Sequence, residues 1–198
     1  MSIESPITED DNWFIGEDKL FEYYITTSPR VRASKTALKD ATAISVAPLP
    51  EALANGDKVR FAPAGEAGVV ATISAAASAG ATSLAVNALS GTVHSGTHGG
   101  KVLDITGWAL EWVLRSSPGG TTALITKTTA AGGGISITDG ASGVCRVTIA
   151  DTDTLNAAGD PPVELNPGRY YKTLRRTDDG TEVVLSFGEA VLRQPATR

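Results

Sequence analysis

A duplication with a period of forty residues constrains the fold of this chain more than any other feature of its sequence. Residues 41–56 match residues 81–96 without gaps, with five identical positions and conservative pairs such as Ile44 with Leu84. Strand-like runs follow at 57–61 and 101–103, and residues 68–74 alternate as another strand between the copies. A lone hairpin is marginally stable in water, whereas two such units can bury each other's apolar faces. The repeat therefore predicts an internally duplicated small β module, and two copies are too few for a solenoid.

The residues on either side of this module predict further β-strands. Residues 19–27, KLFEYYITT, combine aromatic and β-branched residues, as strands do. From residue 104 onward, short alternating runs follow one another and are separated by Gly, Pro and Asp turns. These runs lie at residues 104–115, 124–127, 135–137, 144–149, 169–174 and 181–187. The pattern predicts an all-β fold, an antiparallel β-sandwich with a small inserted β module.

Composition excludes several classes of protein. Hydrophobic residues make up 41% of the chain and charged residues 20%, so the chain can build a core and is not disordered by composition. The net charge is −5 with both signs interspersed, which gives no electrostatic footprint for nucleic acid. No apolar run approaches the ~20 residues of a membrane-spanning helix. Cys145 is the single cysteine, so an intrachain disulfide is excluded.

The region from residue 104 to residue 193 resembles a β-sandwich domain of tail, baseplate and fibre-attachment proteins of tailed bacteriophages. The resemblance rests on short elements in a fixed order, namely DITGW (104–108), WVLR (112–115), GISITD (134–139), DT (153–154), NPGRY (166–170), RTDDG (176–180) and LSFG (185–188). GEDKLF at residues 16–21 is similar to the opening strand of such domains, which normally comes shortly before the DITGW element. The duplicated module is itself similar to small Ala-, Thr- and Gly-rich β inserts of phage structural proteins.

In this chain, residues 28–100 separate the opening strand from the DITGW element. We therefore expect a β-sandwich of residues 12–30 and 101–194 that carries the duplicated module, residues 37–100, in its first loop. Residues 1–11 are polar and acidic and are predicted to form a flexible arm. Such an insertion is physically reasonable, because loop-closure entropy grows slowly with loop length. For residues 28–40, which carry four basic side chains, a surface loop is the first interpretation and a short helix the second.

Four features could carry chemistry, and for each we favour a structural explanation. His94 and His98 are four residues apart but lie in a Gly-rich loop rather than on a helix. Asp151 and Asp153 are similar to the start of a calcium loop, but this loop lacks its central Gly and its last ligand, so we predict a turn that joins two strands. The glycines at 132–134 do not open a helix after a strand, so no phosphate cradle is indicated. Cys145 lies in a strand, as a buried thiol does. We predict no enzyme activity, no catalytic residue, no cofactor and no metal.

The aromatic residues are predicted to serve mainly in the core. Trp108 and Trp112 share one face of the strand at 104–115 with apolar neighbours, which is typical of a sandwich core. A carbohydrate-stacking platform built from Trp108, Trp112, Tyr170 or Tyr171 is the alternative. Trp13 and Phe14 come directly after the acidic arm. Capping the core and contacting a neighbouring subunit explain Trp13 equally well, so Trp13 and Phe14 are the candidate partner contacts.

The resemblance implies a non-enzymatic structural protein of the virion, namely an adaptor or connector in a phage tail or baseplate that attaches fibres or neighbouring subunits. Its partners would be other virion proteins, and it would be a homo-oligomer, such as a trimer, in which weak contacts act together. It would be located in the virion after assembly in the host cytoplasm. A capsid cement protein is one alternative, and a carbohydrate-binding module for host-surface glycan is another. No nucleic-acid partner and no membrane span are expected.

Overall fold

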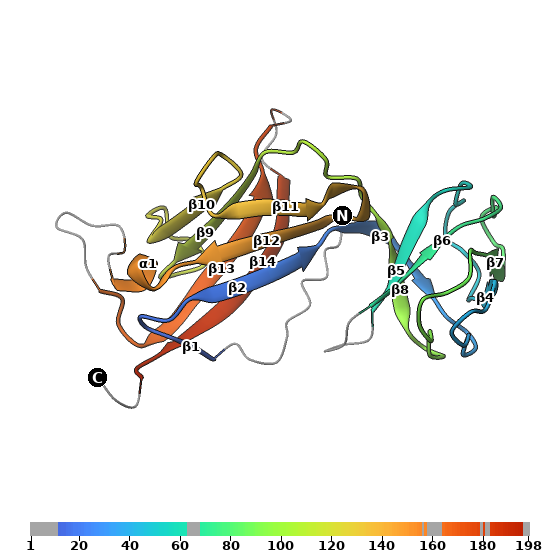
Figure 1. Ribbon diagram of the computed structural model, residues 1–198, viewed down its shortest axis with the longest axis horizontal. Helices are drawn as coiled ribbons and strands as arrows, with labels where there is room; N and C mark the ends of the chain where they lie inside the picture. The colour runs from blue at the N-terminus through green and yellow to red at the C-terminus, as the bar shows by residue number, and fades with distance from the viewer. Residues whose placement is uncertain are drawn as a thin grey trace. The chain divides into compact units, whose positions relative to one another are not determined.

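The structure is a computed structural model that describes residues 12–62, 68–155, 157, 164–178, 180 and 183–195. It confirms the all-β fold class, because the regular elements of the described residues are strands except for one five-residue helix and one 3-10 turn (Figure 1). Contacts divide the chain into two compact units, one of which is Ile25–Asp104, while the other combines residues 12–24 with those from Ile105 onward. The predicted arm at residues 1–11 lies outside the described residues. No described helix is long and apolar enough to cross a membrane.

The unit Ile25–Asp104 contains the sequence repeat and has an internal two-fold arrangement. Its larger sheet has the strand order β3 (Thr26–Arg32), β8 (His98–Val102), β5 (Lys58–Phe61) and β6 (Val69–Thr72), and a smaller sheet pairs β4 (Ala43–Ser45) with β7 (Ser83–Ala85). The bridge between Ala37 and Val93 has its counterpart in the bridge between Ala77 and Leu53, which is the same pair with the two copies exchanged. The copies therefore fold into one intertwined unit and not into two consecutive hairpins.

The core of this unit is built from equivalent side chains of both copies. Leu49 and Leu89, which occupy the same position of the repeat, are 4% and 2% exposed. Burial of one such side chain contributes about 1.5–3 kcal/mol to folding. Because each copy buries its apolar side chains against the other, the forty-residue unit supplies only half of a core. The largest buried side chains here are Ile44, Leu53, Phe61, Ile73, Leu84 and Leu89.

The second unit is a β-sandwich. Its larger sheet has the strand order β1 (Asn12–Phe14), β14 (Val183–Arg193), β13 (Gly168–Arg176), β9 (Leu110–Arg115) and β10 (Ile125–Thr128). Its smaller sheet has the order β11 (Ile135–Asp139), β12 (Val144–Ile149) and β2 (Lys19–Tyr24). All strand pairs are antiparallel except β1 with β14, which is parallel. A 3-10 turn (Gly140–Ser142) precedes β12, and a five-residue helix, α1 (Asp151–Leu155), follows β12.

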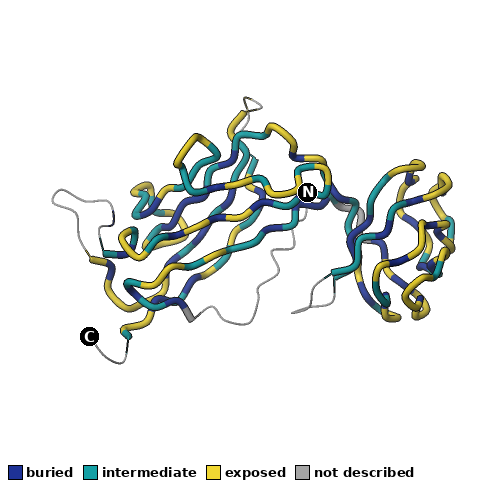
Figure 2. Tube along the Cα trace, in the orientation of Figure 1, coloured by how far each residue is buried: buried dark blue, intermediate teal, exposed yellow. Residues whose placement is uncertain are grey.

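Aromatic side chains fill the space between the two sheets. Phe21 of β2 stacks on Trp112 of β9 with ring centroids 5.7 Å apart, and Trp13 meets Phe21 edge-on at 6.0 Å. The ammonium group of Lys172 lies 4.6 Å from the Phe21 ring centroid, although Lys172 is only 5% exposed. Buried and exposed positions alternate along β12, where Cys145, Val147 and Ile149 face the core (Figure 2). This confirms the alternation predicted for that strand.

Four predictions about local structure are wrong. His98 begins β8 and does not lie in the predicted Gly-rich loop. Residues 28–32 are not a loop or a helix but part of β3, because Val31 and Ala33 alternate into the module core with small side chains that give a weak pattern. Asp151 and Asp153 lie in a short helix and not in a plain turn. Trp108 precedes β9 rather than lying in the strand and is only partly buried, since it follows a turn in which Gly107 adopts a left-handed conformation (φ 76°).

The boundary between the two units also differs from the expected one. The unit that holds the repeat begins at Ile25 and ends at Asp104, whereas we placed the module at residues 37–100. The reason is that the whole of β3 pairs with β8, so that the chain enters the module directly after β2.

Candidate functional site

The sandwich carries an open groove with a volume of about 460 Å³. Its walls come from two parts of the unit, namely residues 107–109 with Thr129 on one side and residues 135–137 on the other. Residues 107–109 lead into β9, Thr129 follows β10, and residues 135–137 belong to β11. Both β10 and β11 are the last strands of their sheets, so the groove lies where an edge of each sheet ends.

Trp108 is the aromatic residue of the groove, and its indole ring is held by Arg176. The guanidinium carbon of Arg176 lies 4.0 Å from the ring centroid of Trp108, which is within cation–π distance. Asp178 binds Arg176 with two hydrogen bonds, from Nε to Oδ1 at 2.6 Å and from Nη2 to Oδ2 at 3.2 Å. Hydrogen bonding to Arg176 lowers the pKa of the Asp178 carboxyl below its usual value. The ring is therefore oriented by a charged pair and remains partly exposed.

The backbone holds this arrangement in place. The amide of Thr177 donates a hydrogen bond to the carbonyl of Ala109 at 2.9 Å, directly beside Trp108. Arg176 also pairs in register with Leu110 at the end of the β13–β9 ladder. Because Trp108 and Arg176 lie on adjacent chain segments joined by these bonds, the orientation of the indole is set by the sheet and not by a free loop.

On the opposite wall, β11 offers a free backbone edge at Ile137. Thr148 of β12 donates a hydrogen bond to the carbonyl of Gly134 at 2.8 Å, and Ile137 is opposite Cys145. Hydrogen-bonded and non-hydrogen-bonded pairs alternate along an antiparallel ladder. Ser136 with Arg146 is then the next hydrogen-bonded pair, and the N–H and C=O of Ile137 point away from β12. An edge of this kind is the site at which another strand can pair.

The triple glycine at residues 132–134 forms the turn between β10 and β11. An isolated β-bridge between Gly134 and Thr128 joins the start of β11 to the end of β10. A Cβ atom on Gly133 would lie 2.5 Å from the carbonyl oxygen of Thr128, so no larger residue fits there. Gly132 and Gly134 adopt positive φ angles of 74° and 86°. These glycines serve the tight turn between the two sheets.

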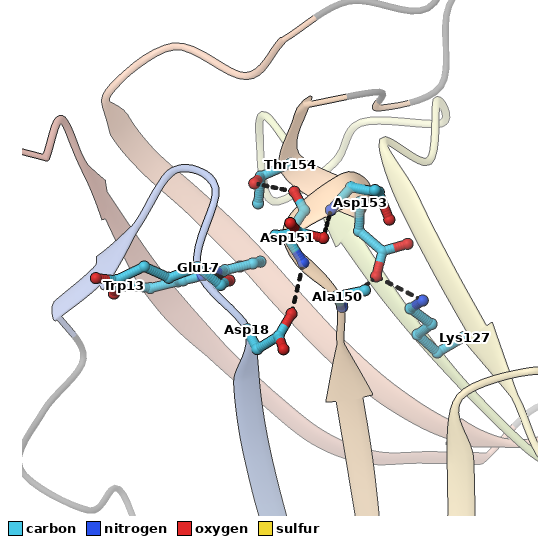
Figure 3. Close-up of polar contacts among 9 residues, drawn as sticks. Trp13, Glu17, Asp18, Lys127, Ala150, Asp151, Asp153 and Thr154 are labelled. Carbon is cyan, nitrogen blue, oxygen red and sulfur yellow. Dashed lines mark hydrogen bonds and ion pairs between the residues drawn. The ribbon is translucent and has the colours of Figure 1, made fainter. Parts of the chain in front are cut away.

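The acidic start of α1, residues 151–153, has a structural role, and Figure 3 shows its contacts. Asp153 accepts a hydrogen bond from the amide of Ala150 at 2.6 Å and pairs with Lys127 Nζ at 2.6 Å. The amide of Asp151 donates to Asp18 at 2.8 Å, and the fully buried Thr154 accepts from the amide of Gly16 at 2.9 Å. These bonds cap α1 and tie it to the turn before β2.

The remaining candidates for chemistry are not brought together. His94 and His98 are exposed, and the described residues contain no group of three or more His, Cys, Asp or Glu that could hold a metal ion. Cys145 is completely buried, and burial raises the pKa of its thiol to about 12. Gly132, Asp151 and Cys145 each have the local structural role described above.

The predicted partner contacts and sugar-stacking residues have different environments. Trp13 is 1% exposed, which favours its role in capping the core, and Phe14 is half-buried beside it in β1. Trp112 and Tyr170 are buried, so the carbohydrate interpretation is wrong for these two residues. Tyr170 instead donates its hydroxyl to the carbonyl of Asn166 at 2.7 Å. Trp108 and Tyr171 are partly exposed.

The sequence did not indicate Arg176 or Ile137 as parts of a site. Arg176 could have been found only through its place in the RTDDG element, since Asp178 follows it at the spacing of a local ion pair. Ile137 carries no signal, because whether a strand lies at the edge of a sheet depends on pairing and not on local sequence. Comparison with protein-family models, with curated proteins and with solved structures finds no match to this chain.

Proposed function

We propose that this chain is a non-enzymatic structural protein of a tailed-phage virion, an adaptor or connector in the tail or baseplate that attaches fibres or neighbouring subunits. The resemblance of residues 104–193 to tail and baseplate sandwiches supports this proposal. The observation that carries it is the groove in which the free edge at Ile137 faces an oriented Trp108. A groove with backbone groups on one side and an aromatic ring on the other fits an extended peptide segment.

In this mechanism a partner segment adds to β11 as a further strand. Its backbone pairs with the N–H and C=O of Ile137, and one of its side chains packs on Trp108. Backbone hydrogen bonds supply affinity, while the pocket next to the added strand supplies specificity. Each hydrogen bond contributes about 0.5–1.5 kcal/mol net, so a single short strand binds weakly. Symmetric assembly of several copies, such as a trimer, would make such contacts strong by multivalency.

The location of the chain in particles is the first test. A cryo-EM reconstruction or antibody labelling of purified virions places the chain directly. Density at the baseplate or at the root of the fibres is the expected result. Density over the head would replace the proposal with a capsid cement protein. Absence of the chain from purified particles would contradict both structural roles.

A pair of substitutions tests the strand-addition mechanism. Ile137→Pro removes the N–H that an added strand needs, and proline is tolerated at edge positions whose N–H is not used in the ladder. Ile137→Val keeps the N–H and most of the side chain and is the matched control. We expect both proteins to fold, with the same circular dichroism, and only Ile137→Pro to be lost from assembled particles. Normal incorporation of a folded Ile137→Pro protein would contradict strand addition at β11.

A further inference from the structure

The outer face of the five-stranded sheet, which points away from the sandwich core, is a second surface with ligand-binding character. Leu110, Trp112 and Leu114 of β9 are buried on the inner face, so the residues between them point outward. The strand register then places outward side chains of β13 and β14 beside the outward side chains of β9, so that they form rows across the three strands. The outward residues of the central rows are Val113, Thr173 and Phe187, and then Arg115, Tyr171 and Glu189.

Phe187 and Tyr171 form an aromatic pair on this face. Their ring centroids are 6.1 Å apart and their planes differ by 14°, so the two rings lie nearly parallel. Phe187 is 56% exposed. All eleven aromatic residues lie in the described part of the chain, and Phe187 is the one among them that is exposed, while the others are buried or half-buried. A large exposed aromatic ring beside a second one marks a binding surface more often than an isolated exposed side chain does.

The apolar part of the face is small. Val184, which is 56% exposed, belongs to the row next to Phe187, opposite Arg175. Val113 lies on the same face two strands away but is only 2% exposed, because its neighbours cover it. Stable protein–protein interfaces bury about 800 Å² on each partner. Two rings and one valine are a small apolar centre for an interface of that size.

Polar groups frame the rings with both donors and acceptors. Glu189 is directly opposite Tyr171 across the β13–β14 ladder, and its carboxylate lies 3.5 Å from Arg169 Nη1. The side chain of Arg169 is 73% exposed and that of Glu189 is 51% exposed, so both remain available to a ligand. On the other side of the rings, Glu111 and Arg175 pair at 2.6 Å. Two of the three arginines next to the rings, Arg169 and Arg175, are therefore paired with carboxylates within the face, and the third, Arg115, lies opposite Tyr171.

We propose that the face formed by Tyr171 and Phe187 binds a pyranose ring of an uncharged glycan. The apolar C–H face of the sugar would pack on the aromatic rings, and its hydroxyl groups would hydrogen-bond with the guanidinium of Arg169 and the carboxylate of Glu189. A pair of neighbouring aromatic rings, one of them exposed, with a few polar groups at its margin gives both the contact area and the orientation that such a ligand needs. The two carboxylates of the face, Glu111 and Glu189, favour a neutral sugar over an acidic one. This site is separate from the groove at Trp108 and independent of the proposed adaptor role.

The test uses the full chain and a panel of neutral oligosaccharides of glucose, galactose, mannose, rhamnose and N-acetylglucosamine. Binding is measured by glycan array and by NMR, following the ring signals of Tyr171 and Phe187. We expect at least one sugar to shift these signals at concentrations up to about 10 mM, and Phe187→Ala to weaken the binding roughly tenfold or more. Phe187→Trp should keep it. Two matched controls are Leu38→Ala, at another exposed apolar residue, and Trp108→Ala in the groove, and both should bind like the parent protein.

Three results would overturn the proposal. The first is the absence of any shift across the panel with a folded protein. The second is binding that Trp108→Ala abolishes and Phe187→Ala leaves unchanged, which would move the sugar site to the groove. The third is a shift of the Tyr171 and Phe187 signals with protein concentration alone, which would identify this face as a contact between copies of the chain. Because Phe187 is exposed, its substitution leaves the fold intact, which a thermal melt verifies.

Discussion

The indole N–H of Trp112 donates a hydrogen bond of 2.8 Å to the hydroxyl of Tyr23, and this bond joins the two sheets of the sandwich inside its core. Trp112 is fully buried and Tyr23 is 1% exposed, so water cannot replace either partner. A buried donor that loses its acceptor costs about 1–3 kcal/mol. The bond therefore fixes the relative positions of Trp112 and Tyr23 in a core that is otherwise apolar.

We predict that Tyr23→Phe lowers the free energy of unfolding of the sandwich by about 1–3 kcal/mol, because the indole N–H is left unsatisfied in the core. Chemical denaturation followed by tryptophan fluorescence measures the change. Tyr171→Phe removes a hydroxyl on the outer face of the sheet and is the matched control, with an expected change within about 0.5 kcal/mol. Equal stabilities of the two variants would contradict the role of the Trp112–Tyr23 bond.

The second prediction concerns the internal symmetry of the duplicated unit. Leu49 and Leu89 are the same residue at the same position of the repeat and are buried to the same degree. Leu49→Ala and Leu89→Ala should therefore each destabilise this unit by about 2–5 kcal/mol, and the two losses should agree within about 1 kcal/mol. Leu38→Ala, at a residue that is 67% exposed, should change little. If one leucine tolerates alanine and the other does not, the copies do not share one core.

The third prediction uses a left-handed backbone position at which one copy has aspartate and the other has glycine. Asp40 has a φ of 66° and occupies the position of Gly80, whose φ is 81°. Glycine adopts this left-handed conformation without strain, whereas other residues lose about 1 kcal/mol. Gly80→Ala should cost about 1 kcal/mol from conformation alone, because a Cβ atom there meets nothing within 4 Å.

The reciprocal substitution Asp40→Gly should leave the stability unchanged or raise it by a few tenths of a kcal/mol, since relief of the left-handed strain offsets the greater freedom of glycine in the unfolded chain. Thermal unfolding of both variants measures the difference. A stabilising Gly80→Ala would contradict the assignment of strain to this turn.

The sequence was sufficient for much of the fold. Strands such as β12 could be predicted because Cys145, Val147 and Ile149 alternate with polar residues. The repeat indicated that the two copies have the same local structure. The sequence could not show that the copies exchange partners, because a bridge such as Ala37 to Val93 depends on long-range pairing. The parallel pairing of β1 with β14 was hidden for the same reason, since three residues carry no pattern of their own.

The candidate groove was harder to predict than the fold. Trp108 continues the period-two pattern of β9, and only the left-handed turn at Gly107 moves it out of the strand. Its partner Arg176 comes from a strand more than sixty residues away and meets it through the β13–β9 ladder. A site at the edge of two sheets is defined by which strands end each sheet, and single-strand patterns do not contain that information.

The last prediction concerns acid stability and the ion pair between Asp57 and Lys101, which are 2.8 Å apart. Burial raises the pKa of the Asp57 carboxyl, but hydrogen bonds from the Lys101 ammonium and the Ala54 amide outweigh it, so that the net pKa is lowered. A carboxyl whose pKa is lower in the folded state stabilises the protein above its unfolded pKa. That contribution disappears as the pH falls below about 4 and through the lowered folded pKa.

Asp57→Asn should therefore cost up to about 1 kcal/mol at neutral pH and nothing once the pH is below the folded pKa of Asp57, so the stability curves of parent and variant should converge in acid. Thr97 takes the place of Asp57 in the other copy, so the effect belongs to one copy only. Glu51→Gln, at an exposed acid of the same unit, controls for the loss of one negative charge. Urea unfolding at a series of pH values measures all three proteins, and a constant difference between Asp57→Asn and the parent across the acid range would show that the pair does not titrate as described.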